Sequence, residues 1–261
     1  METPEQRRAR EQRRVLFDGV AGLYDATRQG YPPEIVDAVV ANAAIGPGAA
    51  VLEIGCGTGQ LTRQLAGRHF ALTAIDIGAA MVRAARSNVA DATARFEVCS
   101  FEDFEDSGPF DLIVSATAFH WIDPGVGLDK AARLLRPGGW LALLTTGERY
   151  PEPLQGRLRD LWVRYGRQAV EWAGQPAWRE ALRQSGHFGA TVEASHTAAL
   201  RLPAETVTGV ERTRATFLSY TEEDQANFTA ELTALLEPGS HIELTQGTFL
   251  AMAPRASAGT V

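Results

Sequence analysis

Three glycines stand at alternate positions just after an apolar run at residues 51–54: Gly55, Gly57 and Gly59. Glycine permits a tight turn and lets a ligand lie against the backbone without a side-chain clash. Asp76 ends the next apolar run, where a carboxylate can accept hydrogen bonds from a ribose diol. Together these features predict a nucleotide-type ligand. Two alternatives stay open: a plain connection between strand and helix, and an N-cap role for Asp76.

The glycine spacing separates two classes of ligand. Dinucleotide-binding proteins use G-x-G-x-x-G, but the sixth position here is Gln60 or Thr62, depending on the glycine from which it is counted. An oxidoreductase is therefore disfavoured. The segment 53–59 instead has the pattern E-x-G-x-G-x-G, which resembles the first motif of class I S-adenosylmethionine-dependent methyltransferases.

Further segments resemble motifs of the same family in the same order. They are residues 74–77 with Met81, residues 98–104, residues 110–115, and residues 134–140 with their Pro-Gly-Gly. The family commonly has an aspartate at the position of Ser100. The resemblance implies S-adenosyl-L-methionine as cofactor, with contacts from Tyr24, Arg28, Glu53, Gly55, Cys56, Gly57, Gly59, Asp76, Ile77, Met81, Ser100, Phe101, Glu102 and Ser115.

Two other segments resemble small-molecule methyltransferases similar to trans-aconitate methyltransferase. In the N-terminal segment, the resemblance implies that Tyr24 and Arg28 approach the methionine carboxylate; the alternatives are helix packing and a solvated charge. It also implies a substrate site with Tyr31, His120 and Trp121. His120 is a candidate catalytic base because imidazole titrates near neutral pH, or it shapes the floor of the pocket.

Apolar runs of strand length alternate with amphipathic stretches along the chain. Strands are expected at residues 50–54, 71–75, 94–99, 110–115, 140–145, 191–202 and 247–253. Helices are expected at residues 33–44, 60–66, 79–90 and 126–135, and over much of 154–185 and 204–236. This order predicts an α/β fold with a doubly wound, mostly parallel seven-stranded sheet of Rossmann-like methyltransferase type, an antiparallel edge strand and helical cap insertions.

We expect one methyltransferase domain over residues 1–260, with three parts: lid helices at 15–45, a cofactor-binding core at 46–146, and acceptor-side insertions and edge strands at 147–260. The insertions supply aromatic side chains that can line an acceptor pocket or pack in a core: Tyr150, Trp162, Tyr165, Trp172, Phe217 and Tyr220.

Composition excludes several classes of protein. Acids outnumber bases 32 to 25, which disfavours a nucleic-acid partner. No apolar run reaches the roughly 18 residues of a membrane span, so no membrane partner is expected. Two cysteines, Cys56 and Cys99, cannot form a disulfide framework or a zinc site alone, so no metal is expected.

The N-terminus lacks the apolar core of a secretory signal, so we expect a cytoplasmic protein. We expect it to be a monomer or a homodimer. The chain has 24 arginines and one lysine, Lys130, and we attribute this excess of arginine to the base composition of the genome.

The leading hypothesis is O-, N- or C-methylation of a small-molecule acceptor, with a carboxylate or hydroxyl favoured. Methylation of a base nitrogen is disfavoured because residues 115–119 lack the Pro-Pro-Tyr clamp of such enzymes. A protein that binds the cofactor without methylating, such as a cyclase or an interaction module, remains an alternative.

Overall fold

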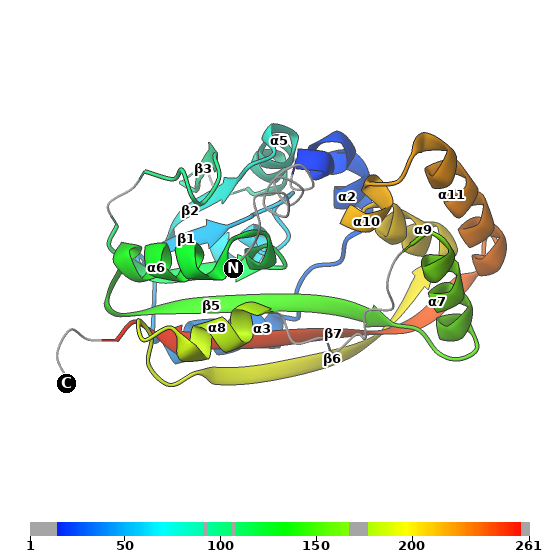
Figure 1. Cartoon of the computed structure of the whole chain (residues 1–261). Helices are drawn as coiled ribbons and strands as arrows, with labels where there is room; N and C mark the ends of the chain where they lie inside the picture. Colours follow the sequence, from blue (N-terminus) through cyan, green and yellow to red (C-terminus); the bar gives the residue numbers. More distant parts are fainter. Residues whose placement is uncertain (1–14, 91–92, 106–107, 167–176, 257–261) are drawn as a thin grey trace. The chain divides into compact units, whose positions relative to one another are not determined.

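Strands and helices alternate along the chain in the computed structural model, which describes residues 15–90, 93–105, 108–166 and 177–256 (Figure 1). The strands are β1 (Ala50–Ile54), β2 (Ala71–Asp76), β3 (Arg95–Val98), β4 (Phe110–Ala116), β5 (Leu135–Arg149), β6 (Val192–Pro203) and β7 (His241–Pro254). The first helices are η1 (Leu16–Val20), α2 (Ala21–Thr27), α3 (Pro33–Ala43), α4 (Thr62–Ala66), α5 (Ala79–Asn88), η2 (Phe119–Trp121) and α6 (Pro124–Leu134). The later ones are α7 (Leu154–Arg164), α8 (Ala177–Gln184), α9 (Ala204–Arg212), α10 (Ala215–Leu218) and α11 (Glu222–Leu236).

The described strands form one seven-stranded sheet in the order β3-β2-β1-β4-β5-β7-β6. β1 pairs in parallel with β2 and β4, and the pairs β2–β3 and β4–β5 are also parallel. β6 and β7 form the antiparallel pair at one edge, so the predicted fold class is confirmed. The strand order reverses between β1 and β4, and open sheets of this kind bind ligands at the carboxyl ends of the strands beside such a reversal.

Both faces of the sheet are buried at the strands β1, β2 and β4, which explains the nearly continuous apolar runs in their sequence. Ile113 and Leu141 pack on one face with α6 and α8. Their chain neighbours Leu112 and Ala142 pack on the other face with α3 and α4. Successive side chains of a strand therefore enter two separate cores, and neither face of β4 is free to tolerate polar substitutions.

Several elements differ from their predicted bounds. β5 starts at Leu135, where the sequence predicted a turn over the Pro-Gly-Gly, and β7 starts six residues earlier than expected, at His241 rather than residue 247. The register between β4 and β5 shifts between Phe110 and Leu112. Gly139 makes this irregular pairing possible, because a Cβ there would lie 2.9 Å from the carbonyl oxygen of Phe110. The helix expected from residue 60 begins at Thr62, and residues 204–236 form the three helices α9, α10 and α11. Trp172 lies outside the described residues.

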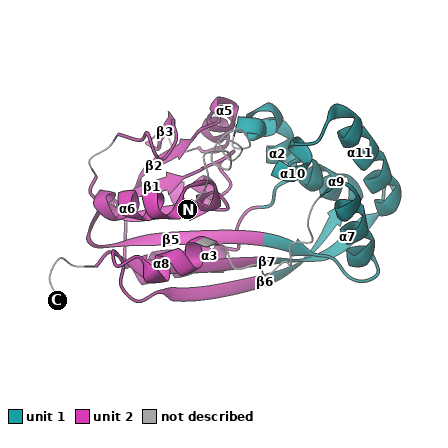
Figure 2. Ribbon diagram, viewed as in Figure 1, with its two compact units in different colours: residues 1–29, 147–174, 197–247 teal, residues 30–146, 175–196, 248–261 magenta. Residues whose placement is uncertain are grey.

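The chain divides into two compact units, coloured separately in Figure 2. Unit 1 contains residues 1–29, 147–174 and 197–247, and unit 2 contains residues 30–146, 175–196 and 248–261. Unit 2 has the two cores of the sheet, and unit 1 has its own apolar core of Tyr150, Leu158, Leu161, Ala204, Val207, Phe217, Phe228, Leu232, Leu236 and Leu244. In the described part of the chain, no helix has the length and apolar character needed to cross a membrane.

Within unit 1, α2 and α9 approach each other at a glycine. A Cβ on Gly209 would lie 2.3 Å from Thr27 Cγ2 and 3.1 Å from Thr27 Cβ. Thr27 is itself buried, and its hydroxyl donates to the carbonyl of Leu23 at 2.8 Å. The absence of a side chain at Gly209 therefore sets the distance between these two helices.

We predict that Gly209→Ala destabilises the protein by about 1–3 kcal/mol, because overpacking outweighs the gain in helix propensity. Urea denaturation measures the difference. Gly22→Ala is the matched control: this helical glycine has open space around it, so the variant is expected to be neutral or more stable. Thr27→Ser removes the clashing methyl, and adding it to Gly209→Ala should restore part of the loss. A stable Gly209→Ala single variant contradicts this packing.

Candidate functional site

The glycine turn after β1 uses backbone conformations that favour glycine. Gly55, Gly57 and Gly59 have φ angles of 72°, 54° and 93°, in the left-handed region. The amides of Gly55 and Cys56 both donate to the carbonyl of Ile75, at 2.8 and 3.0 Å. The turn is thus bonded to β2, the strand that carries Asp76.

Two of these glycines also allow close packing. A Cβ on Gly55 would lie 2.3 Å from the Cβ of Ala118, in the loop after β4. A Cβ on Gly59 would lie 3.3 Å from the Cα of Ala85 in α5. Substitution at Gly55 would therefore separate the turns that follow β1 and β4, which lie side by side at the carboxyl end of the sheet.

Asp76 connects the turns after β1 and β2. Its Oδ2 accepts from the amide of Gly57 at 2.9 Å, and its Oδ1 accepts from the amide of Gly78 at 2.8 Å. The N-cap of α5 is Gly78, and no side chain caps this helix. Asp76 is therefore not the N-cap residue of α5. It is half-buried at the end of β2, where its carboxylate bridges two turns.

Glu53 lies beneath the glycine turn in β1 and is almost completely buried, with 2% of its surface exposed. Its Oε2 has no hydrogen-bond partner among the described residues. Burial raises the pKa of the Glu53 carboxyl to about 8, although the nearby Thr62 side chain opposes this shift, and the charge of Asp76 adds to it to a smaller extent. Glu53 is therefore mostly protonated at neutral pH, and an unpaired buried oxygen next to a glycine turn is the kind of atom that a ligand can satisfy.

Three further predicted cofactor residues lie in the glycine turn, after β2 and in α5: Cys56, Ile77 and Met81. Cys56 and Met81 are buried, and Ile77 is half-buried. Burial, with a smaller contribution from the charge of Asp76, raises the pKa of the Cys56 thiol well above its usual range. Cys56 is therefore a poor nucleophile at neutral pH, in agreement with a role as a small spacer.

The predicted residues after β3 form a tight turn. The amide of Asp103 donates to the Ser100 hydroxyl at 3.0 Å, and that hydroxyl donates to Asp103 Oδ2 at 2.7 Å. Phe101 is buried in the core of unit 2, and Glu102 is half-buried. The amide of Cys99 donates to the carbonyl of Asp76 at 3.0 Å, which joins this turn to the end of β2.

Ser115, the last predicted cofactor residue, lies inside the sheet. Its side chain is completely buried, and its hydroxyl donates to the carbonyl of Ile54 at 2.9 Å. The hydroxyl thus joins the ends of β4 and β1 next to the glycine turn.

His120 and Trp121 lie in η2, just after β4, with their ring centroids 4.8 Å apart. His120 keeps an exposed surface, yet the protein packed around the imidazole disfavours its charged form and lowers its pKa to about 4. The ring is therefore neutral at pH 7. It can accept a proton, although as a weaker base than a fully solvated histidine.

Tyr31 lies in the same unit and contacts the loop that leads to His120. Its hydroxyl lies 3.2 Å from Thr117 Oγ1, and its carbonyl accepts from Gln64 Nε2 at 2.8 Å. Thr117 has a positive φ of 56°, and its amide donates to the carbonyl of Leu144 at 2.8 Å. The structure thus places the predicted substrate residues Tyr31, His120 and Trp121 around one loop.

Tyr24 and Arg28 belong to unit 1. Arg28 Nε donates to Thr213 Oγ1 at 2.9 Å, and its Nη2 donates to the carbonyls of Thr213 and Val210 at 3.2 and 3.4 Å. Its guanidinium also lies 5.2 Å from the centre of the Tyr24 ring. A cation is favourable at the C-terminus of a helix, here α9. These contacts give Arg28 a structural role, and contact with a cofactor carboxylate stays a prediction.

Unit 1 contains a nearly buried ionic cluster that the sequence analysis missed. Arg214 bonds Glu148 and Glu211, each at 2.8 Å, and Glu211 accepts from the indole of Trp162 at 3.1 Å. Although burial opposes the shift, the charges of Arg214 and Arg28 hold the pKa of Glu148 below its usual range. Removing one partner of such a cluster leaves a buried charge uncompensated.

Two polar side chains that the sequence analysis missed hold the turns of unit 2. Asn88 Nδ2, at the end of α5, donates to the carbonyl of Thr58 in the glycine turn at 2.9 Å. Lys130, in α6, donates to the turn after β3. The sequence marks Lys130, because it is the one lysine of the chain. It does not mark Asn88, because asparagine is common near the end of a helix.

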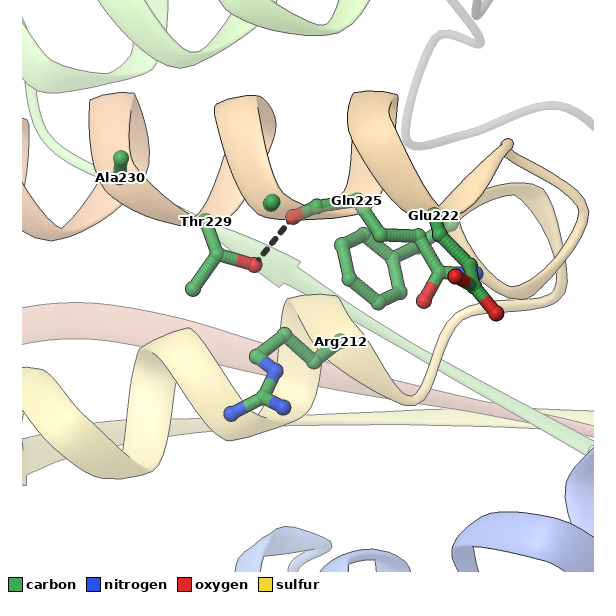
Figure 3. A pocket seen from close by; sticks show the side chains of 7 residues that line it. Arg212, Glu222, Gln225, Thr229 and Ala230 are labelled. Carbon is green, nitrogen blue, oxygen red and sulfur yellow. Dashed lines mark hydrogen bonds between the residues drawn. The ribbon is translucent and has the colours of Figure 1, made fainter.

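Each unit also contains an open pocket. Figure 3 shows the pocket of unit 1, of about 470 Å³, where Arg212 of α9 lies opposite Gln225 and Thr229 of α11. Phe217, one of the predicted aromatic residues, also lines it. The pocket of unit 2, of about 750 Å³, is lined by Arg63, Ala66, Gly67, His69, Phe70, Asn88, Val89, Ala90 and Thr93. Neither pocket is lined by the glycine turn or by Asp76.

Residues 51–139, which include β1 to β4 and the glycine turn, match the family described as a methyltransferase domain. The chain is 33% identical over 130 residues to an uncharacterized methyltransferase of Mycobacterium tuberculosis, covering 50% of this chain and 51% of the relative. It is 32% identical over 151 residues to a malonyl-[acyl-carrier protein] O-methyltransferase of Paenibacillus, covering 52% of this chain and 54% of the relative. The chain thus spans about half the length of these curated relatives.

A solved structure of a candidate type II methyltransferase from Anaeromyxobacter dehalogenans is similar over most of the chain. The TM-score is 0.63 at 22% identity, and the match covers 88% of this chain and 99% of that one. At this identity the likeness establishes the fold, and it supports the strand order described above.

The burial of Glu53 generates a pH prediction for the protein without ligand. The folded protein keeps the carboxyl proton up to a pH of about 8, whereas the unfolded chain loses it near the ordinary pKa of 4.5. The free energy of unfolding should therefore fall as the pH rises through this window, by a few kcal/mol at most. Glu53→Gln cannot ionise and should lose this dependence.

Urea denaturation at pH 5, 6.5 and 8 checks the prediction, with Glu34→Gln as the control because Glu34 is an exposed acid in α3. The control variant should show the pH dependence of the parent. An equal pH dependence in Glu53→Gln and the parent would mean that the Glu53 carboxyl is solvated.

Proposed function

We propose that residues 51–139, which match the methyltransferase domain family, belong to a class I S-adenosylmethionine-dependent methyltransferase and that the protein transfers a methyl group to a small-molecule acceptor. One observation carries the proposal. The glycine turn after β1 is bonded through Gly57 to Asp76 at the end of β2, inside the residues that match the methyltransferase family. This is the place where open parallel sheets bind nucleotide-type ligands.

The residues present fit S-adenosylmethionine. Asp76 can accept hydrogen bonds from ribose hydroxyls, and Glu53 has an unpaired buried oxygen beside the turn. The backbone of Gly55, Gly57 and Gly59 presents no side chain to the ligand. When bound, the cofactor supplies a methyl group that its sulfonium has already activated. The protein then has to align the acceptor and exclude water.

We place the acceptor next to Tyr31, His120 and Trp121, and we favour a hydroxyl or a carboxylate as the methylated group. A hydroxyl acceptor must lose a proton, and the neutral imidazole of His120 can receive it. A carboxylate acceptor is already ionised at neutral pH and needs no base. The relative from Paenibacillus, named as a malonyl-[acyl-carrier protein] O-methyltransferase, supports oxygen as the acceptor atom.

A second role is distinguishable by experiment. A protein of this fold that binds the cofactor without methylating would keep the same glycine turn and the same Asp76 contacts. Only turnover separates the two roles. A screen of organic acids, phenols and amines with methyl-labelled cofactor should transfer label to at least one acceptor class.

The cofactor proposal predicts that the protein binds S-adenosylhomocysteine in calorimetry and does not bind NAD. Asp76→Ala removes a charged acceptor of ribose hydroxyls, and such a bond is worth roughly 1.5–3 kcal/mol. Affinity for S-adenosylhomocysteine should therefore fall about tenfold to a hundredfold. Glu34→Ala, which removes an exposed acid of α3, is the control for loss of an acid. Tight NAD binding with none for S-adenosylhomocysteine contradicts the proposal.

The base role predicts that His120→Ala lowers turnover of a hydroxyl acceptor by roughly a hundredfold or more and leaves cofactor affinity unchanged. His120→Gln should not restore turnover, because an amide is not a useful proton acceptor. If His120→Gln restores activity, His120 positions the acceptor and is not the base.

A further inference from the structure

Lys130 lies in the middle of α6 and is the one lysine in a chain with 25 basic residues of the Lys and Arg types. Its side chain points at the turn after β3. Nζ donates to the carbonyl of Glu102 at 2.8 Å and to the carbonyl of Phe104 at 2.7 Å. The ammonium also lies 5.6 Å from the centre of the Phe101 ring. A single side chain thus makes three contacts with one short turn.

This arrangement depends on a compact cation. An ammonium group has three donors on a flexible stem, so it can satisfy two carbonyls that lie close together. Phe101 and Phe104 are both buried, and the backbone between them turns within four residues. Without the ammonium, the two carbonyls would lose their partner at the border of the core, which is costly for partly buried polar groups.

The turn held by Lys130 continues directly from the cofactor-side end of β3. Cys99 donates to the carbonyl of Asp76, and Ser100 and Asp103 close the turn with two hydrogen bonds. The position of Phe101 and Glu102 relative to Asp76 is therefore set by one backbone bond at the start of the turn and by Lys130 at its end.

The helix that carries Lys130 is itself fixed to the loop after β4. A Cβ on Gly127 would lie 2.8 Å from Ile122 Cγ2 and from Phe119 Cζ, so α6 packs closely on η2. Lys130 is one helical turn further along. α6 therefore connects the turn after β3 with the segment that contains His120.

From this geometry we propose that Lys130 is a positioning residue for the adenosine part of the cofactor. It fixes the turn at residues 100–104, which is joined to Asp76 by the hydrogen bond from the amide of Cys99. The inference rests on the proposed function, since only the family resemblance implies that Ser100, Phe101 and Glu102 contact the cofactor, on its adenine side. Lys130 acts through the turn and does not itself contact the cofactor.

The single lysine allows a direct test on the intact parent protein. Lysine labelled with ¹³C at the ε-carbon gives one side-chain signal if the expression tag contains no lysine. We expect S-adenosylhomocysteine and adenosine to shift this signal, because both order the turn that Lys130 holds. L-homocysteine should leave it unchanged.

Calorimetry with variants provides the second measurement. Lys130→Met should weaken S-adenosylhomocysteine and adenosine by the same factor, about tenfold or more, because the loss concerns only the adenosine part. Arg133→Met is the matched control, because it removes a cation from the same helix three residues further along. Arg133 is exposed and forms an ion pair with Asp129 at 3.0 Å. This control should bind both ligands as the parent does. Lys130→Arg is the second variant, in case Lys130→Met does not fold, because it keeps the positive charge. It should bind S-adenosylhomocysteine more weakly than the parent, because the planar guanidinium does not fit the carbonyls of both Glu102 and Phe104.

The outcomes separate the inference from the proposed function. If the parent binds S-adenosylhomocysteine, but the lysine signal does not move and the Lys130 variants bind as tightly as the parent, Lys130 has no positioning role and the cofactor proposal stands. If the parent binds neither S-adenosylhomocysteine nor adenosine, both the proposed function and the role of Lys130 are wrong.

Discussion

The amides of Gly57 and Gly78 converge on one carboxylate, that of Asp76. These two bonds tie the turn after β1 to the turn after β2 at the carboxyl end of the sheet. Gly55 extends the assembly to the loop after β4, because only a residue without a side chain leaves room for Ala118. Three turns from distant parts of the sequence are thus joined at one edge of the sheet, and the glycine turn and Asp76, both proposed to contact the cofactor, lie there.

Two carboxyl groups at this edge have contrasting surroundings. Asp76 is half-buried and accepts two backbone hydrogen bonds, whereas Glu53 is deeply buried with one unpaired oxygen and a pKa raised to about 8. Environments that separate two neighbouring acids in this way commonly give them different roles. We propose on this basis that Asp76 accepts hydrogen bonds from ligand hydroxyls and that the protonated Glu53 donates a hydrogen bond to a ligand beside the turn.

The sequence predicts much of this fold because its signals are local. Nearly continuous apolar runs identify β1, β2 and β4 to within one residue, since strands buried on both faces have apolar side chains at most positions. The glycine turn is also local, because consecutive residues supply its positive φ angles. The start of β5 was missed because the Pro-Gly-Gly that predicts a turn is accommodated by a shift in register against β4.

The contacts that the sequence did not predict join distant segments. Lys130 bonds carbonyls 26 and 28 residues away, and Arg28 bonds Thr213 across 185 residues. The ionic cluster of Arg214 joins residues from β5 and α9 in the same way. No local pattern marks such pairs, because each side chain alone has the composition of a solvated surface. The one lysine among many arginines nevertheless indicated a special role for Lys130. It was overlooked because the excess of arginine was attributed to base composition.

The claim that Asp76 and the glycine turn build the cofactor site is tested most directly by two-dimensional ¹H–¹⁵N spectra recorded during a titration with S-adenosylhomocysteine. The amides of Gly57 and Gly78 both donate to the Asp76 carboxylate, so a ribose that binds this carboxylate must change their surroundings. We predict that these two amides are among the most strongly shifted signals. Saturable binding that leaves both amides unmoved, with the largest shifts elsewhere in the protein, would contradict this account.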